Sequence, residues 1–446
     1  MYRPNYSVSN ADSPSSVREY YPGVPKFLEV TQHSYVEEEL IKLFRHQMAF
    51  SHASGDGCAK IYNLSLRTFQ EGSTKITSEI VWNAFFIHAL LLHHTRSRLC
   101  MKLPHHGEQS DRIASALLAC NEAMVGVGQV EWAHACDDCE KIVEVDAPEG
   151  VGRTWARLTA DCSRPGTGIA TLTRHSIRTP VHREVEEERR RKGRAMFELK
   201  RRLQARDVAS TIRAVPSVDE SSSLLDDPDL DDPAFLDDPG LTSNVERKKP
   251  TVPPAKVKST LTRRWTHNEQ LLVRPCGIVI SRATFYEAES LPNCRLFLNA
   301  SFPKHFPDAR PSFLFFDNNC KLLAHLVNVE DKHLLHMGFP VDVFHAVRKH
   351  GQSDGYCQDH CNPAGFPELI GEQPGEWVFN SSACKQVNVW FAKFFPIVRE
   401  MSEVHFNFFL DEMIAIHNQV QISELTSKHR HPRLVPVEEF VWTQSV

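Results

Sequence analysis

One short polar stretch, DVFHAVRKHGQSDGYCQDHC, concentrates histidine and cysteine side chains. In this stretch His345 and His350 precede Cys357 and Cys361, and His360 lies between the two cysteines. Zinc takes four nitrogen or sulfur ligands in tetrahedral geometry, and two compact pairs on a loop can supply them. The spacing differs from that of a standard zinc finger, so a zinc site and a chance cluster both remain open interpretations.

A second candidate metal site is the sequence HACDDC, in which two residues separate Cys136 from Cys139. One such cysteine pair is half of a zinc site. Spacing does not choose among the residues that could complete it, which are His134, Cys162, His175 and His182. A redox role is disfavoured, because the pair does not open a helix after a buried strand. Two unligated surface thiols are the alternative.

A carboxylate follows a strongly apolar run in FLFFDNNCKL, where Asp317 comes directly after Phe316. A carboxylate at the end of a buried strand is held rigidly and still faces solvent. Such a position suits a Mg²⁺ ligand in a nuclease or a transposase. A polar turn is the simpler interpretation and is favoured by the pattern alone, because Asp and Asn are common turn residues.

The elements expected to position these side chains fall into two groups. In the first part, Ser34 and Glu37 have capping-box spacing, so a helix is predicted from Ser34 onward, and helices follow over 77–94 and 110–126. A long charged helix is expected over 180–206. In the last third, the runs CGIVISRATFY, SFLFF and PVDVF predict strands, and two helices follow them, which is typical of a mixed α/β layer.

Composition shifts divide the chain. Three Asp-Asp-Pro repeats interrupt any regular backbone hydrogen bonding and place many like charges together, which predicts a disordered linker. The expected divisions are a disordered arm (1–20), a mainly helical domain ending at the CxxC pair (21–150), a cysteine-poor region with the charged helix (151–215), the linker (216–260), the α/β domain (261–425) and a tail (426–446).

Charge and hydropathy restrict the class of protein. A formal net charge of −5 over 446 residues disfavours a protein that binds polyanions over its whole surface, so any contact with DNA must be local. The N-terminus lacks the apolar core of a signal peptide. The longest apolar run, Ile80–Leu92, is too short to span a bilayer. We therefore expect a soluble intracellular protein without membrane contact, whose 12 cysteines are reduced thiols.

Several segments, in order, resemble fungal proteins that carry cysteine clusters associated with KDZ (Kyakuja-Dileera-Zisupton) transposases. They are YYPGVPKF, CAKIYN, ITSEIVW and HACDDC in the first part, and THNEQLLVRPCGIVISRATFY, FFDNNCKL, CNPAGFPEL and WVFNSSACKQVNVW in the last. EEERRRKGRAMFELKRRL resembles the charged helix that follows the second cysteine cluster of these proteins. That second cluster is abbreviated in this chain. The likeness covers most of residues 20–420, apart from the linker.

The resemblance implies an RNase H-like C-terminal fold in which three acidic residues hold Mg²⁺. Asp317 would be the second acid, and the third would fall where this chain has Lys385. The first acid would lie near the abbreviated cluster, where Asp161 is the nearest carboxylate. An ammonium group repels Mg²⁺ and offers no lone pair while protonated. An active enzyme would therefore need other helical carboxylates, of which Glu400 and Glu412 are available.

The resemblance also implies that His345, His350 and Cys357 match His and Cys positions of the transposases. The favoured function is a zinc-supported, DNA- or protein-binding relative of a transposase without strand-transfer activity. An active DNA transposase, which alone would need magnesium, and a metal-stabilised interaction module are the alternatives. A transposon-derived protein would act in the nucleus, with RRRK or KKPTVPPAKVK as candidate import signals.

Overall fold

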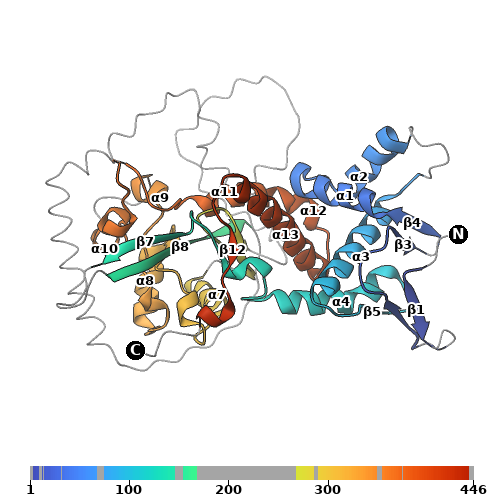
Figure 1. The fold of residues 1–446 in the computed structure, drawn as a ribbon, viewed down its shortest axis with the longest axis horizontal. Coiled ribbons are helices and arrows are strands. Elements are labelled where there is room, and N and C mark those ends of the chain that lie inside the picture. Colours follow the sequence, from blue (N-terminus) through green and yellow to red (C-terminus); the bar gives the residue numbers. More distant parts are fainter. Residues whose placement is uncertain are drawn as a thin grey trace, which may run out of the picture.

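The computed structural model describes residues 4–9, 13, 15–31, 33–67, 75–145, 154–167, 268–285, 290–348, 354–373 and 375–440. The charged helix expected over 180–206 and the linker expected over 216–260 lie outside these residues. Within them the fold is mixed α and β, as predicted, with a helical N-terminal part at one end and a mixed sheet at the other (Figure 1). Among the described residues, no helix is both long enough and apolar enough to cross a membrane.

The N-terminal part combines short strands with four helices. Its strands are β1 (Tyr6–Ser9), β2 (Val17–Tyr20), β3 (Phe27–Thr31), β4 (Ser34–Glu37) and β5 (Lys102–Pro104). Its helices are α1 (Glu38–Ser51), α2 (Gly55–Ile61), α3 (Ser78–Arg96) and α4 (Gln109–Met124). The π-helical turn η1 (Tyr62–Leu66) follows α2. Helices α3 and α4 confirm the two that were predicted from apolar spacing.

Two expectations for this part are wrong. The arm predicted to be disordered contains β1 and β2, which pair with each other, and β2 also pairs with β5. Aromatic packing orders it, because the rings of Tyr6 and Tyr20 lie 5.1 Å apart and the Tyr6 hydroxyl donates to Glu29. The predicted capping box is also absent: Ser34–Glu37 form β4, which pairs with β3, and α1 begins only at Glu38.

A buried histidine makes the N-terminal core sensitive to acid. His88 on α3 is fully buried, and burial together with the charges of Arg45 and Lys42 lowers its pKa to about 3. As the pH falls, His88 takes up a proton in the unfolded state before it does so in the folded state. The contribution of neutral His88 to the free energy of unfolding is therefore complete above the pKa of the unfolded state and is lost as the pH falls below it. Between neutral pH and about pH 5 we expect a loss of about 2 kcal/mol from this residue.

Urea titrations at several pH values test this expectation. In His88→Leu the free energy of unfolding should fall less on acidification, because no buried group resists protonation. The exposed His429→Gln variant should keep the wild-type dependence. An unchanged pH profile in His88→Leu would contradict the assignment.

The C-terminal part is built on a mixed sheet in the order β10-β9-β8-β11. Strands β8 and β9 are antiparallel, as are β9 and β10, whereas β11 runs parallel to β8. Strand β7 pairs with the first half of β8. The bounds are β7 (Glu140–Val145), β8 (Thr154–Thr167), β9 (Asn268–Val273), β10 (Val279–Phe285) and β11 (Phe313–Phe316).

This sheet changes the expected division of the chain. The α/β domain was predicted to begin at residue 261, yet its long inner strand β8 precedes the predicted linker. The sequence of β8, TWARLTADCSRPGT, contains several charged and polar residues as well as a proline and a glycine, so it lacks the β-branched and aromatic run by which the other strands were recognised. Strands β10 and β11 confirm two of the predicted runs.

Helices cover both faces of the sheet. On one face Leu314 and Phe316 of β11 pack with α7 (Leu291–Ser301) and α8 (Asn319–Asn328). On the other face Phe313 and Phe315 belong to the core that also contains α11 (Ala383–Phe391). Shorter helices follow the chain around this layer, namely α9 (Val343–Arg348), α10 (Gly355–His360) and α12 (Phe395–Val398).

The strand predicted over PVDVF is wrong, because helix α9 begins within it. The Asp342 carboxylate accepts hydrogen bonds from the backbone N–H groups of Phe344 and His345 at 3.0 and 3.3 Å. Such capping satisfies the first amides of a helix and outweighs the β propensity of two valines and a phenylalanine. The run therefore starts a helix.

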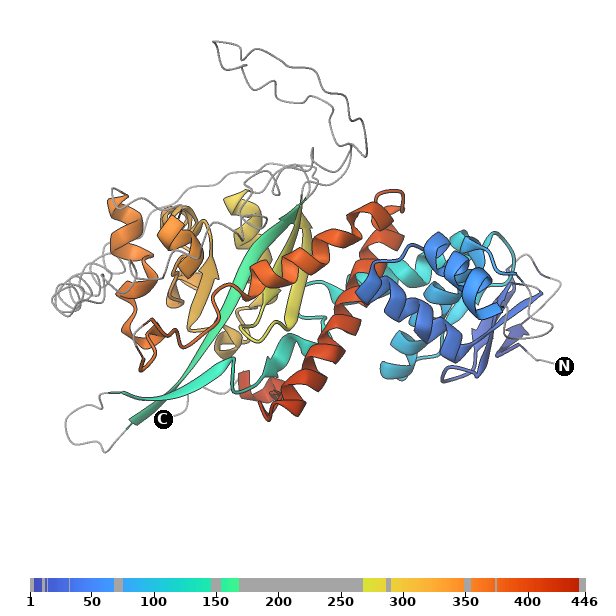
Figure 2. The ribbon, with the colours of Figure 1, turned by 90° about the horizontal axis from the view of Figure 1, so that it is seen from above.

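Helix α13 (Glu403–Ser427) lies between the two ends of the molecule and contacts α1 and α4 as well as β10 (Figure 2). Its Glu412 pairs with Arg45 of α1, and its Asp411 pairs with Arg282 of β10. The predicted tail is packed in its described part: β12 (Arg433–Leu434) pairs with β6 (His134–Ala135). The short helix η12 (Val437–Phe440) then places Phe440 against Trp132 of η3 (Val130–Ala133).

Candidate metal centre and strand-end carboxylate

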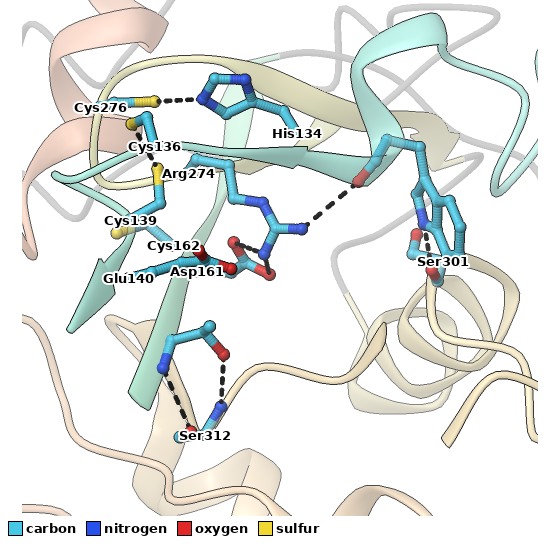
Figure 3. Close-up of polar contacts among 12 residues, drawn as sticks. His134, Cys136, Cys139, Glu140, Asp161, Cys162, Arg274, Cys276, Ser301 and Ser312 are labelled. Atoms are coloured by element: carbon cyan, nitrogen blue, oxygen red, sulfur yellow. Dashed lines mark hydrogen bonds and ion pairs between the residues drawn. The ribbon is translucent and has the colours of Figure 1, made fainter. Parts of the chain in front are cut away.

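Four buried side chains from two segments that are distant in sequence meet at the tip of the β9–β10 hairpin. His134 belongs to β6, Cys136 and Cys139 lie in the turn after it, and Cys276 lies at the tip of the β9–β10 hairpin (Figure 3). We call these four residues the tetrad. The turn is closed by the N–H of Cys139, which donates to the carbonyl of Cys136 at 2.9 Å. The hairpin tip requires Gly277, whose φ of +90° favours glycine.

The geometry of the tetrad suits a tetrahedral metal ion. Its four ligand atoms all lie within 4.8 Å of one another. The sulfur atoms of Cys136 and Cys139 are 3.4 Å apart, and the Cys276 sulfur lies 3.4 Å from Nε2 of His134. Tetrahedral zinc with its usual bond lengths would place two sulfur ligands about 3.7 Å apart. The donor set is therefore compatible with metal binding after very small shifts.

The protonation states of the cysteines favour the same interpretation. Hydrogen bonds from Cys139 and Cys276 lower the pKa of Cys136, whereas burial raises the pKa of the other two thiols. A lowered pKa favours the thiolate form of Cys136, and a metal ligand must be a thiolate. All the cysteines are free thiols, so no disulfide competes for these sulfur atoms.

A buried ion pair lies beside the tetrad. Nη1 of Arg274 donates to both carboxylate oxygens of Asp161 at 2.9 and 3.0 Å, and its Nη2 donates to the carbonyl of Trp132 (Figure 3). The Arg274 guanidinium also interacts electrostatically with Cys139 and Cys276, so it places positive charge close to the tetrad. Both carboxylate oxygens of Asp161 therefore bind Arg274, on the face of the sheet that carries the tetrad.

A second metal-capable group contains two residues of the His- and Cys-rich stretch, Asp354 and Cys357. The ligand atoms of Cys320, Asp354 and Cys357 lie within 4.8 Å of one another. Burial, followed by the charges of Cys320 and Asp354, raises the pKa of Cys357 to about 12. Of the four ligands predicted for this stretch, the group contains only Cys357.

The other predicted ligands of the stretch lie as follows. His345 is buried, and its Nδ1 pairs with the Asp342 carboxylate. Cys361 is fully buried in the core, and its N–H donates to the carbonyl of Cys357 at 2.8 Å. His350 lies outside the described residues, so the four-ligand set stays a prediction. His360 is exposed and its ring lies 4.6 Å from that of Tyr356.

Asp317 directly follows β11, as predicted, and is half-buried. Among the described residues, neither metal-capable group includes Asp317, Glu400 or Glu412. Glu400 is exposed beside Arg399, and the buried Glu412 pairs with Nη2 of Arg45 at 2.6 Å. Glu400, predicted to be helical, lies in the turn between α12 and α13, whereas Glu412 lies in α13. In the part of the chain that the structure describes, neither carboxylate joins Asp317 in a metal-capable group of three.

The resemblance implies two further acids near Asp317, and the residues beside it on β8 and α11 can be compared with that expectation. Cys162 of β8 is opposite Phe315, whereas Asp161 is opposite Leu314. Because side chains alternate along a strand, Cys162 shares the face of Phe315 and Asp317, and Asp161 points the other way. On α11, which packs on β8, the ammonium of Lys385 lies 3.6 Å from the centre of the Phe344 ring.

Comparison with known proteins gives one family match. Residues 1–66 match a family described as a CxC5-like cysteine cluster associated with KDZ transposases. No curated protein and no solved structure matches the chain. Within the matched segment Cys58 is the only cysteine, so the tetrad lies downstream of it. The match confirms the resemblance inferred from sequence and links the chain to KDZ transposase-related families.

Proposed function

We propose that this chain is a KDZ transposon-derived protein that binds DNA on a zinc-supported, RNase H-like scaffold and does not perform strand transfer. The order of the sheet supports the RNase H-like part. An RNase H-like core has three antiparallel strands, and a fourth strand runs parallel to the first of them along its other edge. Here β8, β9 and β10 are the antiparallel strands, β11 is parallel to β8, and helices cover both faces of the sheet. Asp317 follows the parallel strand, where a metal-holding carboxylate would be placed.

The observation that carries the loss of catalysis is the chemistry of the residues on β8 and α11 that lie on the same face of the sheet as Asp317. Two-metal catalysis needs several carboxylates to hold and neutralise the ions. Here the β8 residue on the Asp317 face is Cys162, and α11 carries Lys385 where the resemblance implies an acid. Neither a buried thiol nor an ammonium replaces a carboxylate as a Mg²⁺ ligand.

Zinc fits the tetrad better than a hard cation does, because three sulfur donors and one imidazole are soft or borderline ligands. His134, Cys136, Cys139 and Cys276 would hold it. Four protein ligands leave no open position, so the ion would supply folding energy rather than an activated water. Three of its ligands precede β8 in the sequence, and the fourth, Cys276, follows β9. The ion would therefore connect two parts of the chain that are far apart in sequence.

DNA is the proposed partner, and the nucleus the proposed site of action. A transposon-derived scaffold implies contact with DNA. The basic run around 189–191 offers charges for phosphate oxygens on a chain whose net charge is −5. Such contacts give an affinity that falls as salt displaces the protein from the phosphates. A metal-stabilised module without a nucleic-acid role would lack that salt dependence.

One set of samples tests this proposal. Purified chain is incubated with supercoiled plasmid and Mg²⁺ or Mn²⁺, and binding to duplex DNA is measured over a range of salt concentrations. We expect nicking at the background rate, unchanged in Asp317→Ala, and binding that weakens with salt and with glutamine at positions 189–191. The exposed Asp359→Ala serves as the matched control. Nicking that Asp317→Ala abolishes and Asp359→Ala does not would overturn the proposal.

A further inference from the structure

The group formed by Cys320, Asp354 and Cys357 connects two helices at the edge of the sheet. Cys320 lies in the first turn of α8, three residues after Asp317. Asp354 is the N-cap residue of α10, and Cys357 lies in that helix. The three ligand atoms therefore join the start of α8 to the start of α10, beside the strand-end carboxylate.

The hydrogen bonding of Asp354 is compatible with a second role. One carboxylate oxygen, Oδ1, accepts from the N–H of Cys357 at 3.0 Å and caps the helix. An ionised carboxylate has about four acceptor sites on two oxygens, so its other oxygen keeps lone pairs for a cation. The capping bond also fixes the carboxylate beside the thiol of Cys357.

The two thiols differ from ordinary core cysteines in their surroundings. Cys320 and Cys357 are buried and unoxidised, yet an exposed carboxylate lies within reach of both. A cysteine that only fills apolar space needs no carboxylate beside it. Two sulfur atoms and one oxygen converging on one point are the donors that a thiophilic divalent cation takes in proteins.

We propose that Cys320, Asp354 and Cys357 bind a second thiophilic divalent cation, zinc by its donor set, independently of the tetrad. Three protein ligands leave the fourth tetrahedral position for water or a small exogenous ligand. One ligand is exposed and only two are sulfur, so the ion binds more weakly here than at the tetrad. Its binding fastens α10 to the start of α8. This inference goes beyond the proposed function and does not depend on it.

Zinc content and cobalt spectra test the site in the full-length protein. We expect two zinc ions per chain in the wild type and one in Cys320→Ser/Cys357→Ser. On titration with Co²⁺, the double variant should lose the second, weaker step of the thiolate-to-cobalt charge-transfer band and keep the first. Cys294→Ser, which alters a buried cysteine outside both groups, should keep both steps.

The variant Asp354→Asn distinguishes the loss of a metal ligand from a loss of folding. Asparagine is as good an N-cap as aspartate, so α10 should keep its start while the cation loses an anionic ligand. The second ion should then bind at least about 10- to 100-fold more weakly, the loss known for residues that only orient a ligand. A second zinc ion that survives Cys320→Ser/Cys357→Ser would overturn the inference. Unchanged affinity in Asp354→Asn would do the same.

Discussion

Replacing Cys276 by serine is expected to release the metal ion of the tetrad and to unfold the sheet layer. Structural zinc contributes about 10–16 kcal/mol to the folding of small zinc domains. A domain as a whole is stable by only about 5–15 kcal/mol. Cys276 is the ligand that ties the β9–β10 hairpin to the segment before β7, so its loss removes the connection as well as one bond.

Thermal unfolding with and without a chelator, together with metal analysis, measures the effect. The wild type should lose stability when zinc is removed, whereas Cys276→Ser should already be destabilised and should respond less to the chelator. Cys276→His, which supplies a nitrogen ligand, should recover part of the metal binding. The matched control is Cys294→Ala, a buried cysteine of α7 outside the tetrad, with an expected loss of about 1–2 kcal/mol. A Cys276→Ser variant that still binds two zinc ions would contradict the assignment.

The second large effect is expected at Arg282, which neutralises two buried acids. Its side chain is 5% exposed and donates to Glu269 at 2.5 Å and to Asp411 at 2.9 and 3.1 Å. It also donates to the side-chain oxygen of Asn407 at 3.1 Å. Arg282→Met would leave two buried carboxylates without their counter-charge, and breaking a buried pair in this way costs about 3–5 kcal/mol.

Chemical denaturation of a short variant series tests this expectation. Glu269→Gln/Arg282→Met/Asp411→Asn removes all three charges together and should recover much of the loss, because no uncompensated charge remains. Arg399→Met serves as control, since Arg399 is exposed beside Glu400 and such pairs contribute at most about 1 kcal/mol. If Arg282→Met and Arg399→Met lost equal stability, the buried network would not be what joins β10 to α13.

The elements that could be predicted from sequence are those whose signal is local. Helix α3 was recognised from its apolar residues, and Thr77 caps it as a helix N-terminus should be capped. Asp317 was placed after a strand because FLFF is an unbroken apolar run. By contrast, Ser34–Glu37 has a helix-start pattern but pairs with β3, since strand pairing satisfies the same amides and buries Val36. Tertiary contacts decide such cases.

The metal sites show the same limit. Cys136 and Cys139 were recognised because their spacing is visible along the chain, and His134 was among the candidates to complete the site. Cys276 was missed because only the sheet brings it to them, although its Pro-Cys-Gly context between two strands is typical of a metal-binding turn. In the second group most of α8 and all of α9 lie between Cys320 and Cys357, so Cys320 falls outside the His- and Cys-rich stretch and spacing within that stretch did not reveal it.

The position of β8 has a consequence for synthesis on the ribosome. Its partner β9 emerges about 100 residues after β8 is complete, which takes roughly 5–20 s at ordinary rates of translation. Of the partners of β8 that the structure describes, β7 alone has been made by then, and it pairs only with the first half of β8. The second half, with Asp161 and Cys162, must then wait for β9 and β11. A chaperone that shields an open strand edge should therefore raise the yield of folded protein, and slower translation of the intervening segment should lower it.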